Sequence, residues 1–436
     1  MTYWCEHAWL DDGPQAGVLV DVDGTTITAV TRTDDPPAGA TRLPGLVIPG
    51  LANAHSHAFH RGLRGRATGR GTFWTWREQM YALAGRLDPD SYLRLATATY
   101  TEMALAGITC VGEFHYLHHP PGGGRYDDPN AMSAALAQAA HDAGIRLTLL
   151  DTCYLTGGFD TPAEGVQLRF SDGDATAWAD RVDRFRVDCG RVRLGAAVHS
   201  VRAVPAGQIP HLVGWAQRGG TPLHVHLSEQ RAENDACRAA HGRTPTELLH
   251  EHGALGPRTT AVHATHLTEH DLRLLGDTGT GSCLCPSTEA DLGDGIGPAR
   301  ALHDAGSPLS LGSDGHSTID LLAEAHAVEA GQRLRAETRG HFDTPRLLDM
   351  ATTNGHRALG WLDAGRIAPG QRADLVALDL DGPRLAGIPL GGVPTAARAD
   401  DVRDVIAHGR AIVRDRAHEH VPDPARRLRR VLAELS

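Results

Sequence analysis

The segment Leu51–His60, with the sequence LANAHSHAFH, contains two histidines separated by one residue, His55 and His57. It follows an apolar run that is typical of a buried strand. Side chains alternate between the two faces of a strand, so both imidazoles should point the same way, about 7 Å apart. Such a pair can bind one metal ion. The alternative is a pair of ordinary polar residues where a strand meets a loop, so the rest of the chain must supply further ligands.

Histidine and carboxylate residues recur at the ends of other predicted strands. They are His224, His226 and Glu229 in Pro222–Glu229, His263 and His266 farther along, and Asp314 within Leu311–His316. Four strand ends that carry such residues favour a metal site over a set of structural histidines. Three imidazoles and one carboxylate suit Zn²⁺ or Fe²⁺ with a position open for water, whose pKa the ion would lower to about 7.

Glu229 comes three residues after His226, close enough to face that water without binding the metal itself. A carboxylate in this position can take the proton of the water and deliver it to a leaving nitrogen. The alternative role for Glu229 is a hydrogen bond that orients one of the histidines.

Short apolar segments alternate with helix-period stretches through the middle of the chain. The predicted strands are Leu46–Ala54, Thr109–Phe114, Arg146–Thr152, Val192–His199, Pro222–Ser228, Thr260–His266, Gly281–Pro286 and Pro308–Ser313, and two of the helices are Ser91–Ala106 and Asn130–Ala143. This alternation predicts an α/β fold, a (β/α)8 TIM-like barrel whose active site lies at the carboxyl ends of the strands.

At both ends of the chain the sequence instead predicts a succession of short strands. These are Gly17–Val20 and Thr25–Val30, joined by a turn at Asp23-Gly24, and later Gly365–Ile367, Ala373–Leu378, Val402–Ala407 and Ala411–Val413. We expect the two ends to pair in one small sheet. The predicted domains are a flanking β-domain at 1–48 and 363–436, which includes a C-terminal helix, and a barrel at 49–362.

Composition narrows the possible partners. The net charge of −11 and the pI near 6.1 argue against nucleic acid or an anionic membrane as a partner. A small anionic substrate would therefore need locally placed arginines, and the basic run Arg426–Arg430 is predicted to be a solvated helix face. Seven cysteines without CxxC spacing, no signal peptide at the start and no long apolar run predict a cytoplasmic protein.

The first His-x-His pair, the histidines of predicted strands five and six and the aspartate of strand eight together resemble the amidohydrolase superfamily. The resemblance extends over nearly the whole chain and implies a barrel with a flanking β-domain. The metal ligands that it implies are His55, His57, His226 and Asp314. It further implies that Glu229 is the proton shuttle and that His263 hydrogen-bonds the attacking hydroxide or the tetrahedral centre. Asp314 is expected to relay a proton as well.

The chain contains no lysine, so all 42 basic residues are arginine. Binuclear sites of the superfamily use a carboxylated lysine to bridge two metals. The chain is therefore similar to the mononuclear, deaminase-like branch, and we expect one divalent ion, Zn²⁺ or Fe²⁺.

Several longer stretches resemble the iminohydrolases of this superfamily, which convert N-formimino-L-glutamate to N-formyl-L-glutamate and ammonia in histidine degradation. The stretches are Asn53–Arg61, Phe73–Tyr81, Val111–His119, Val198–Val204 and Leu284–Gly295. The expected substrate contacts are Arg77, Tyr116, His199, Arg202 and His60. Arg202 follows predicted strand four, where a guanidinium could bind a carboxylate bidentately, and Arg77 is expected in a loop that closes over the substrate.

This chain differs from these iminohydrolases at two positions. They usually have Gln at the position of His60 and often Ser at that of Gly315, which leaves substrate recognition open. One alternative is a mononuclear deaminase or chlorohydrolase that acts on a purine, pyrimidine or triazine, and another is a non-catalytic metal-binding barrel. The resemblance also implies a homodimer. The cluster His115, His118 and His119 lacks a clear carboxylate partner and is expected to pack in a loop.

Overall fold

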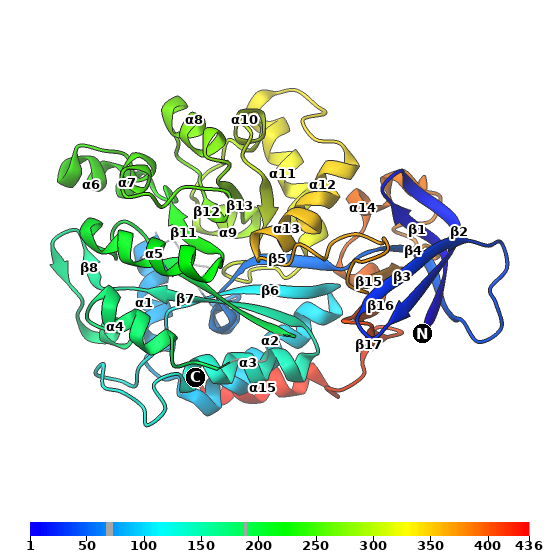
Figure 1. Ribbon diagram of the computed structural model, residues 1–436, viewed down its shortest axis with the longest axis horizontal. Coiled ribbons are helices and arrows are strands. Elements are labelled where there is room, and N and C mark those ends of the chain that lie inside the picture. Colours follow the sequence, from blue (N-terminus) through cyan, green and yellow to red (C-terminus); the bar gives the residue numbers. More distant parts are fainter. Residues whose placement is uncertain (67–72, 187–189, 436) are drawn as a thin grey trace.

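The computed structural model describes residues 1–66, 73–186 and 190–435. Figure 1 shows a large body of strands and helices beside a smaller sheet that contains the N-terminus. The C-terminus lies against the large body, so the chain returns to it after the final strands.

The large body is built around eight parallel strands that neighbour one another in sequence order. They are β5 (Leu51–Ser56), β6 (Ile108–His115), β7 (Arg146–Cys153), β10 (Val192–Val198), β11 (Leu223–Leu227), β12 (Thr259–His263), β13 (Gly281–Leu284) and β14 (Leu309–Leu311). A bridge between Ser56 and Asp314 brings the first and last strands together. The predicted barrel is confirmed, and each predicted barrel strand overlaps an observed one.

The first predicted strand, Leu46–Ala54, is wrong as a single element. The strand is interrupted at Gly50, and the residues before it belong to β4 (Thr41–Pro49) of the other sheet. A Cβ at Gly50 would lie 2.5 Å from Thr109 Oγ1 and 2.6 Å from Asp374 Cβ. Glycine is therefore required for the chain to pass from one sheet into the other.

Helices cover the outside of the barrel. They are α1 (Phe73–Ala84), α2 (Pro89–Leu105), α3 (Ala131–Ala143), α4 (Ala175–Val182), α5 (Ile209–Gly219), α6 (Arg231–His241), α7 (Pro245–Glu251), α8 (Glu269–Asp277), α9 (Pro286–Leu292), α10 (Ala299–Ala305), α11 (Leu321–Ala336), α12 (Thr344–Ala351) and α13 (Thr353–Ala358). Shorter elements are the 3-10 turns η1 (Ala58–Leu63), η2 (Gly165–Arg169) and η3 (Ala206–Gln208), and the hairpin of β8 (Thr156–Gly158) and β9 (Thr161–Pro162).

The predicted helices Ser91–Ala106 and Asn130–Ala143 are confirmed as α2 and α3. Helix α2 begins after Asp88, whose carboxylate accepts a hydrogen bond from the backbone N–H of Ser91 in a capping box. Helix α3 ends at Gly144, which has a left-handed conformation with φ of 75° that suits glycine at a helix end.

The smaller sheet is made from both ends of the chain, as predicted. Its strands run in the order β18-β17-β16-β15-β4-β1-β2-β3. The remaining members are β1 (Thr2–Leu10), β2 (Gly13–Asp23), β3 (Thr26–Arg32), β15 (Leu375–Leu378), β16 (Val402–Ala407), β17 (Arg410–Arg414) and β18 (Ala417–His418). The turn at Asp23-Gly24 joins β2 and β3 as expected. The strand predicted at Gly365–Ile367 is wrong, because those residues form bends.

The end of the chain returns to the barrel. After β15 come η4 (Leu390–Gly392), α14 (Val393–Ala396) and η5 (Ala399–Asp401), and the final helix is α15 (Pro424–Glu434). Helix α15 packs against α2, and Val431 and Leu435 join the barrel core. Arg426, Arg427, Arg429 and Arg430 are exposed, which confirms the predicted solvated face.

Candidate active site

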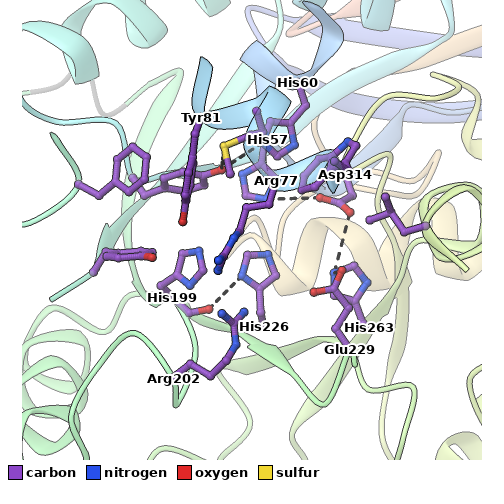
Figure 2. Close-up of a pocket in the computed structure, with 16 residues that line it drawn as sticks. His57, His60, Arg77, Tyr81, His199, Arg202, His226, Glu229, His263 and Asp314 are labelled. Carbon is purple, nitrogen blue, oxygen red and sulfur yellow. Dashed lines mark hydrogen bonds and ion pairs between the residues drawn. The ribbon is translucent and has the colours of Figure 1, made fainter. Parts of the chain in front are cut away.

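Polar side chains converge at the carboxyl ends of the barrel strands (Figure 2). His55 lies on β5 with His57 directly after it, His226 lies on β11, and Asp314 follows β14. One ligand atom from each of these four buried side chains lies within 4.8 Å of the others. The structure therefore brings together the four residues predicted to bind a metal.

The distances within this cluster show which atoms face its centre. The Nε2 atoms of His55 and His57 each lie 3.3 Å from Asp314 Oδ1. The Nε2 atom of His226 lies 3.2 Å from that of His55. Three imidazole nitrogens and one carboxylate oxygen thus point at a common position.

Hydrogen bonds on the far side of two rings fix their orientation. The Nδ1 of His57 donates to the carbonyl of Phe114 and the Nδ1 of His226 donates to that of His199, each at 2.9 Å. A ring nitrogen that faces a carbonyl carries the proton, so the opposite Nε2 presents its lone pair. Both rings are therefore held in the tautomer that a metal needs.

The protonation states of the cluster suit a cation. Burial lowers the pKa of His55 to about 3 and also lowers the pKa of His57 and of His226, so the imidazoles are neutral. Burial acts to raise the pKa of Asp314, but the hydrogen bond with His55 holds it well below its usual value. Three neutral imidazoles and a carboxylate fit a divalent ion such as Zn²⁺ or Fe²⁺.

A second group that could hold a metal shares one member with the first. It consists of His263, Cys285 and Asp314. Burial raises the pKa of the Cys285 thiol well above its usual value, which keeps the sulfur protonated. The thiolate is the form that binds metals, so the His55–His57–His226–Asp314 cluster is the better site.

Glu229 and His263 lie beside the cluster (Figure 2), with 3.8 Å between Glu229 Oε1 and His263 Nε2. Burial raises the pKa of Glu229. Burial opposes the protonation of His263, but the carboxylates of Glu229, Glu289 and Asp314 raise its pKa well above the usual value. The pair can therefore exchange a proton with a group bound between them.

Several non-glycine residues at these strand ends have left-handed backbone conformations. They are Ser228 (φ 50°), His263 (φ 69°), Ala264 (φ 51°), Asp314 (φ 38°) and His316 (φ 58°). Each such residue costs about 1 kcal/mol or more, and a fold retains the strain where surrounding contacts impose it. Here the strain coincides with the strand ends that carry Glu229, His263 and Asp314.

A chain of hydrogen bonds ties the end of β5 to the end of β14. Asn53 Nδ2 donates to Ser313 Oγ at 2.7 Å, and Ser313 Oγ lies 3.0 Å from His316 Nδ1. His316 Nε2 lies 3.2 Å from Ser56 Oγ, which donates to Glu113 Oε2 at 2.8 Å. A single arrangement of the protons gives every group in this chain of hydrogen bonds a partner. In it, Ser313 Oγ donates to His316 Nδ1, and His316 Nε2 donates to Ser56 Oγ. His316 thereby fixes the spacing between the two strands that carry three of the ligands.

Replacing His316 by Ala is expected to lower the affinity for the metal by about 10- to 100-fold. The loss follows because β5 and β14 are no longer held at the spacing that their ligands require. Competition with a chromogenic chelator measures the affinity directly. His211→Ala, a change at an exposed position on α5, is the control. Equal affinities in the two variants would show that His316 does not position the ligands.

The five predicted substrate contacts all line one pocket in front of the cluster. They are His60, Arg77, Tyr116, His199 and Arg202. The guanidinium groups of Arg77 and Arg202 point toward one another across it (Figure 2). Arg77 lies on helix α1 and not in an irregular loop, so the loop prediction is wrong at this residue.

His60 forms part of the pocket wall. Its Nε2 lies 3.0 Å from the hydroxyl of Tyr116. Its ring packs on His57 and Trp76, with centroid distances of 4.5 and 5.1 Å. Burial lowers the pKa of His60 well below its usual value, so the ring is neutral. His60 therefore offers the pocket a neutral polar group between the metal cluster and α1.

Other pocket residues were not predicted. They are Trp76, Met80, Tyr81, Tyr154, Phe170 and Leu292. Tyr154 comes two residues after the predicted strand Arg146–Thr152, so its place at a strand end was a usable signal. Leu292 lies within the stretch Leu284–Gly295 that resembles the iminohydrolases, which was also a usable signal. Phe170 comes from a segment far from any predicted strand end, and nothing in its local sequence indicated a role.

The remaining candidate histidines lie elsewhere. His224 lies on β11 two residues before His226, and its Nε2 lies 2.9 Å from the carbonyl of Ala358, so it is not one of the four converging residues. His118 bonds the carbonyl of Thr152 at 2.8 Å, and His119 bonds Asp172 at 3.1 Å. His118 and His119 thus pack in a loop, as expected, but His119 does have a carboxylate partner, and His115 is the last residue of β6 and not part of the loop. Over residues 1–66, 73–186 and 190–435, no helix is long and apolar enough to cross a membrane.

Comparison with known proteins agrees with this arrangement. The amidohydrolase family matches residues 46–412. The chain is 39% identical to a formimidoylglutamate deiminase of Pseudomonas aeruginosa, with 99% of each chain covered. It is 30% identical to a 5-methylthioadenosine/S-adenosylhomocysteine deaminase of Haloarcula marismortui, covering 95% of this chain and 92% of that one.

A solved amidohydrolase from Brucella melitensis has the same fold. Its TM-score is 0.91 at 32% identity, and 100% of this chain and 99% of that chain are covered. The family match, the two relatives and this likeness extend over most of the sequence and include every strand of the barrel. This chain belongs to the amidohydrolase family.

Proposed function

We propose that the chain is a metal-dependent hydrolase that converts N-formimino-L-glutamate to N-formyl-L-glutamate and ammonia, a step of histidine degradation. The observation that carries this proposal is the pair Arg77 and Arg202, which face one another beside the metal cluster. Two guanidinium groups in one pocket complement a substrate with two carboxylates. The similarity to a formimidoylglutamate deiminase over 99% of both chains supports the same substrate.

The residues around the cluster can perform each proton transfer of this hydrolysis. A divalent cation bound at the four ligands would supply a Lewis acid that lowers the pKa of a water molecule. Glu229 takes a proton from that water while the oxygen of the water bonds to the formimino carbon. Glu229 delivers this proton to the terminal nitrogen, and the second proton passes from the new hydroxyl to the same nitrogen through Asp314. The bond from the carbon to that nitrogen then breaks, so the carbonyl forms and ammonia leaves.

His263 and Asp314 complete this machinery. His263 donates a hydrogen bond to the developing tetrahedral centre from its Nε2. Asp314 Oδ2 lies 3.9 Å from that nitrogen, while Oδ1 faces the other ligands. Asp314 can therefore hold the cation through one oxygen and relay a proton through the other.

Removing the metal is expected to abolish turnover. Dialysis against a chelator should leave less than about a tenth of the activity, and Zn²⁺ or Fe²⁺ should restore it, because no other described group at the site supplies Lewis acidity. Metal analysis of the purified protein is expected to give one ion per chain. Full activity in metal-free protein would contradict the proposed site.

The rival function is deamination of a heterocycle, which the 30% identity to a 5-methylthioadenosine/S-adenosylhomocysteine deaminase favours. Aromatic residues such as Tyr154 and Phe170 line the pocket and could stack on a ring. Ammonia release should be measured with N-formimino-L-glutamate, N-formimino-L-aspartate, guanine and cytosine. Ammonia from a heterocycle and none from the formimino compounds would overturn the proposed substrate.

The oligomeric state stays a prediction. The family resemblance implies a homodimer, which sedimentation velocity would measure at micromolar concentration. The pocket of one chain already contains all the predicted ligands and substrate contacts.

A further inference from the structure

Gln167 is a buried amide on η2 that lies behind the pocket. Its Oε1 accepts a hydrogen bond from the backbone N–H of Glu164 at 3.1 Å. Its Nε2 donates to the hydroxyl oxygens of Tyr81 and Tyr154 at 3.0 and 3.1 Å. Both amide hydrogens are therefore used, and the bond to Glu164 fixes which end of the amide faces the tyrosines.

This arrangement decides what the two phenols can offer. Each phenol oxygen accepts from Gln167, so its own O–H is left to donate. Burial raises the pKa of Tyr154, and a hydrogen bond with Tyr81 adds to the shift, so the hydroxyl keeps its proton. If one hydroxyl donates to the other, one O–H still remains available to a ligand. The pair therefore presents a hydrogen-bond donor and no negative charge.

Neighbouring contacts hold both rings in place. Phe170 packs on Tyr81 and Tyr154 at centroid distances of 6.0 and 5.3 Å. Arg169 donates to the carbonyls of Ala84 and Leu87, which ties η2 to the end of α1. The helix that carries Tyr81 and the turn that carries Gln167 are thus joined, so the hydroxyls have little freedom to turn away.

Both hydroxyls belong to the cationic side of the pocket. Tyr81 and Tyr154 line it together with Arg77 and Arg202. The guanidinium carbon of Arg77 lies 5.4 Å from the centroid of the Tyr81 ring (Figure 2). Arg202 is near enough to Glu229 for its charge to oppose the raised pKa of that carboxyl. Arg202 also acts on Tyr154, more strongly than Arg77 does, so it lies between the reacting carbon and the phenols. Arg77, which stacks on the Tyr81 ring, lies on the side of the phenols.

We propose that Tyr81 and Tyr154, held by Gln167, bind the substrate carboxylate farther from the reacting carbon together with Arg77. This inference rests on the proposed function and names the residues that select a dicarboxylic substrate. A carboxylate needs several donors to replace its water, and a rigid phenol donor beside a guanidinium meets that need. Tyr81 and Tyr154 are binding residues here, and Gln167 is a positioning residue.

Two variants test the subsite. Tyr154→Phe removes one hydroxyl and should raise the KM for N-formimino-L-glutamate about tenfold with kcat changed less than about twofold. Gln167→Glu should raise that KM about 100-fold, because a carboxylate there accepts from both hydroxyls and repels the substrate. The control is Gln217→Glu, the same change at an exposed position on α5. For N-formimino-L-2-aminobutyrate, which lacks the distal carboxylate, Tyr154→Phe should leave KM unchanged.

Binding of glutarate, measured by calorimetry, separates this inference from the proposed reaction. Glutarate should bind wild type and Gln217→Glu equally and bind Gln167→Glu at least tenfold more weakly. If wild type hydrolyses N-formimino-L-glutamate while Tyr154→Phe and Gln167→Glu keep its KM, the subsite is wrong and the function stands. If wild type shows no such turnover but glutarate binding depends on Gln167, the function is wrong and the subsite stands. Equal rises in KM for both substrates would also overturn the subsite, since they indicate a general distortion.

Discussion

Replacing Glu229 by Gln is expected to lower kcat about 1000-fold while the protein keeps its metal. The amide has the shape of the carboxylate but cannot take a proton from water, and general acid–base catalysis contributes about 10²- to 10⁴-fold. Glu229 is not one of the four residues whose ligand atoms converge, so metal binding should persist. The measurements are steady-state ammonia release and metal content per chain.

A matched control separates this loss from a general effect of removing one negative charge. Glu269→Gln makes the same change at an exposed position at the start of α8 and should keep the wild-type rate. Normal turnover in Glu229→Gln would exclude Glu229 as the proton shuttle. A parallel loss of metal would instead indicate that the carboxylate helps to hold the ion.

The metal cluster could be predicted because its members obey a rule that the sequence displays. Parallel strands end at one edge of the barrel, so the histidines and carboxylates at four strand ends could be placed together without knowing any distance. The choice of His55, His57, His226 and Asp314 among them came from the resemblance to the amidohydrolase superfamily. The alternation of apolar segments and helices also gave the barrel and its strand order. These features depend on local periodicity, which is the part of folding that a sequence shows most directly.

Features set by contacts between distant segments could not be predicted in the same way. The apolar run Leu46–Ala54 contains Pro49-Gly50, a dipeptide that often marks a break, but the local sequence does not show that the two halves join different sheets. That division depends on the close approach of Thr109 and Asp374 to Gly50. The role of His316 depends likewise on Ser56, which lies 260 residues away. Gln167 reaches Tyr81 from a turn that has no periodic pattern.

Replacing Asp374 by Asn is expected to lower the free energy of unfolding by about 3–5 kcal/mol. Asp374 lies just before β15 and binds Arg146, the first residue of β7, at 2.5 and 2.9 Å, so the pair joins the flanking sheet to the barrel. Both side chains are only 1% exposed. Without the carboxylate, the guanidinium is left buried with its charge uncompensated. Urea unfolding followed by circular dichroism measures the loss.

The surroundings of this pair make the loss large. Three guanidinium groups, those of Arg146, Arg193 and Arg372, pack against the single ring of Trp361 at 4.1 to 5.0 Å. Burial opposes the ionisation of Asp374, but the charge of Arg146 keeps its pKa low. The carboxylate therefore stabilises the fold at neutral pH, and this contribution is lost only as the pH falls through the lowered pKa. Asp374→Asn at neutral pH should therefore lower the free energy of unfolding as protonation of the Asp374 carboxylate alone would.

Two further variants show whether the buried charge is the cause. Asp304→Asn, in an exposed pair with Arg300, should leave the unfolding midpoint unchanged because solvent screens that pair. The double change Arg146→Met and Asp374→Asn should be more stable than Asp374→Asn alone, since the uncompensated charge is then gone. If Asp374→Asn and the double variant are equally stable, the loss of unfolding free energy comes from packing around Gly50 and not from the buried charge. Either way kcat should be retained, because Arg146 lies at the amino end of β7 and the reacting groups lie at the opposite ends of the strands.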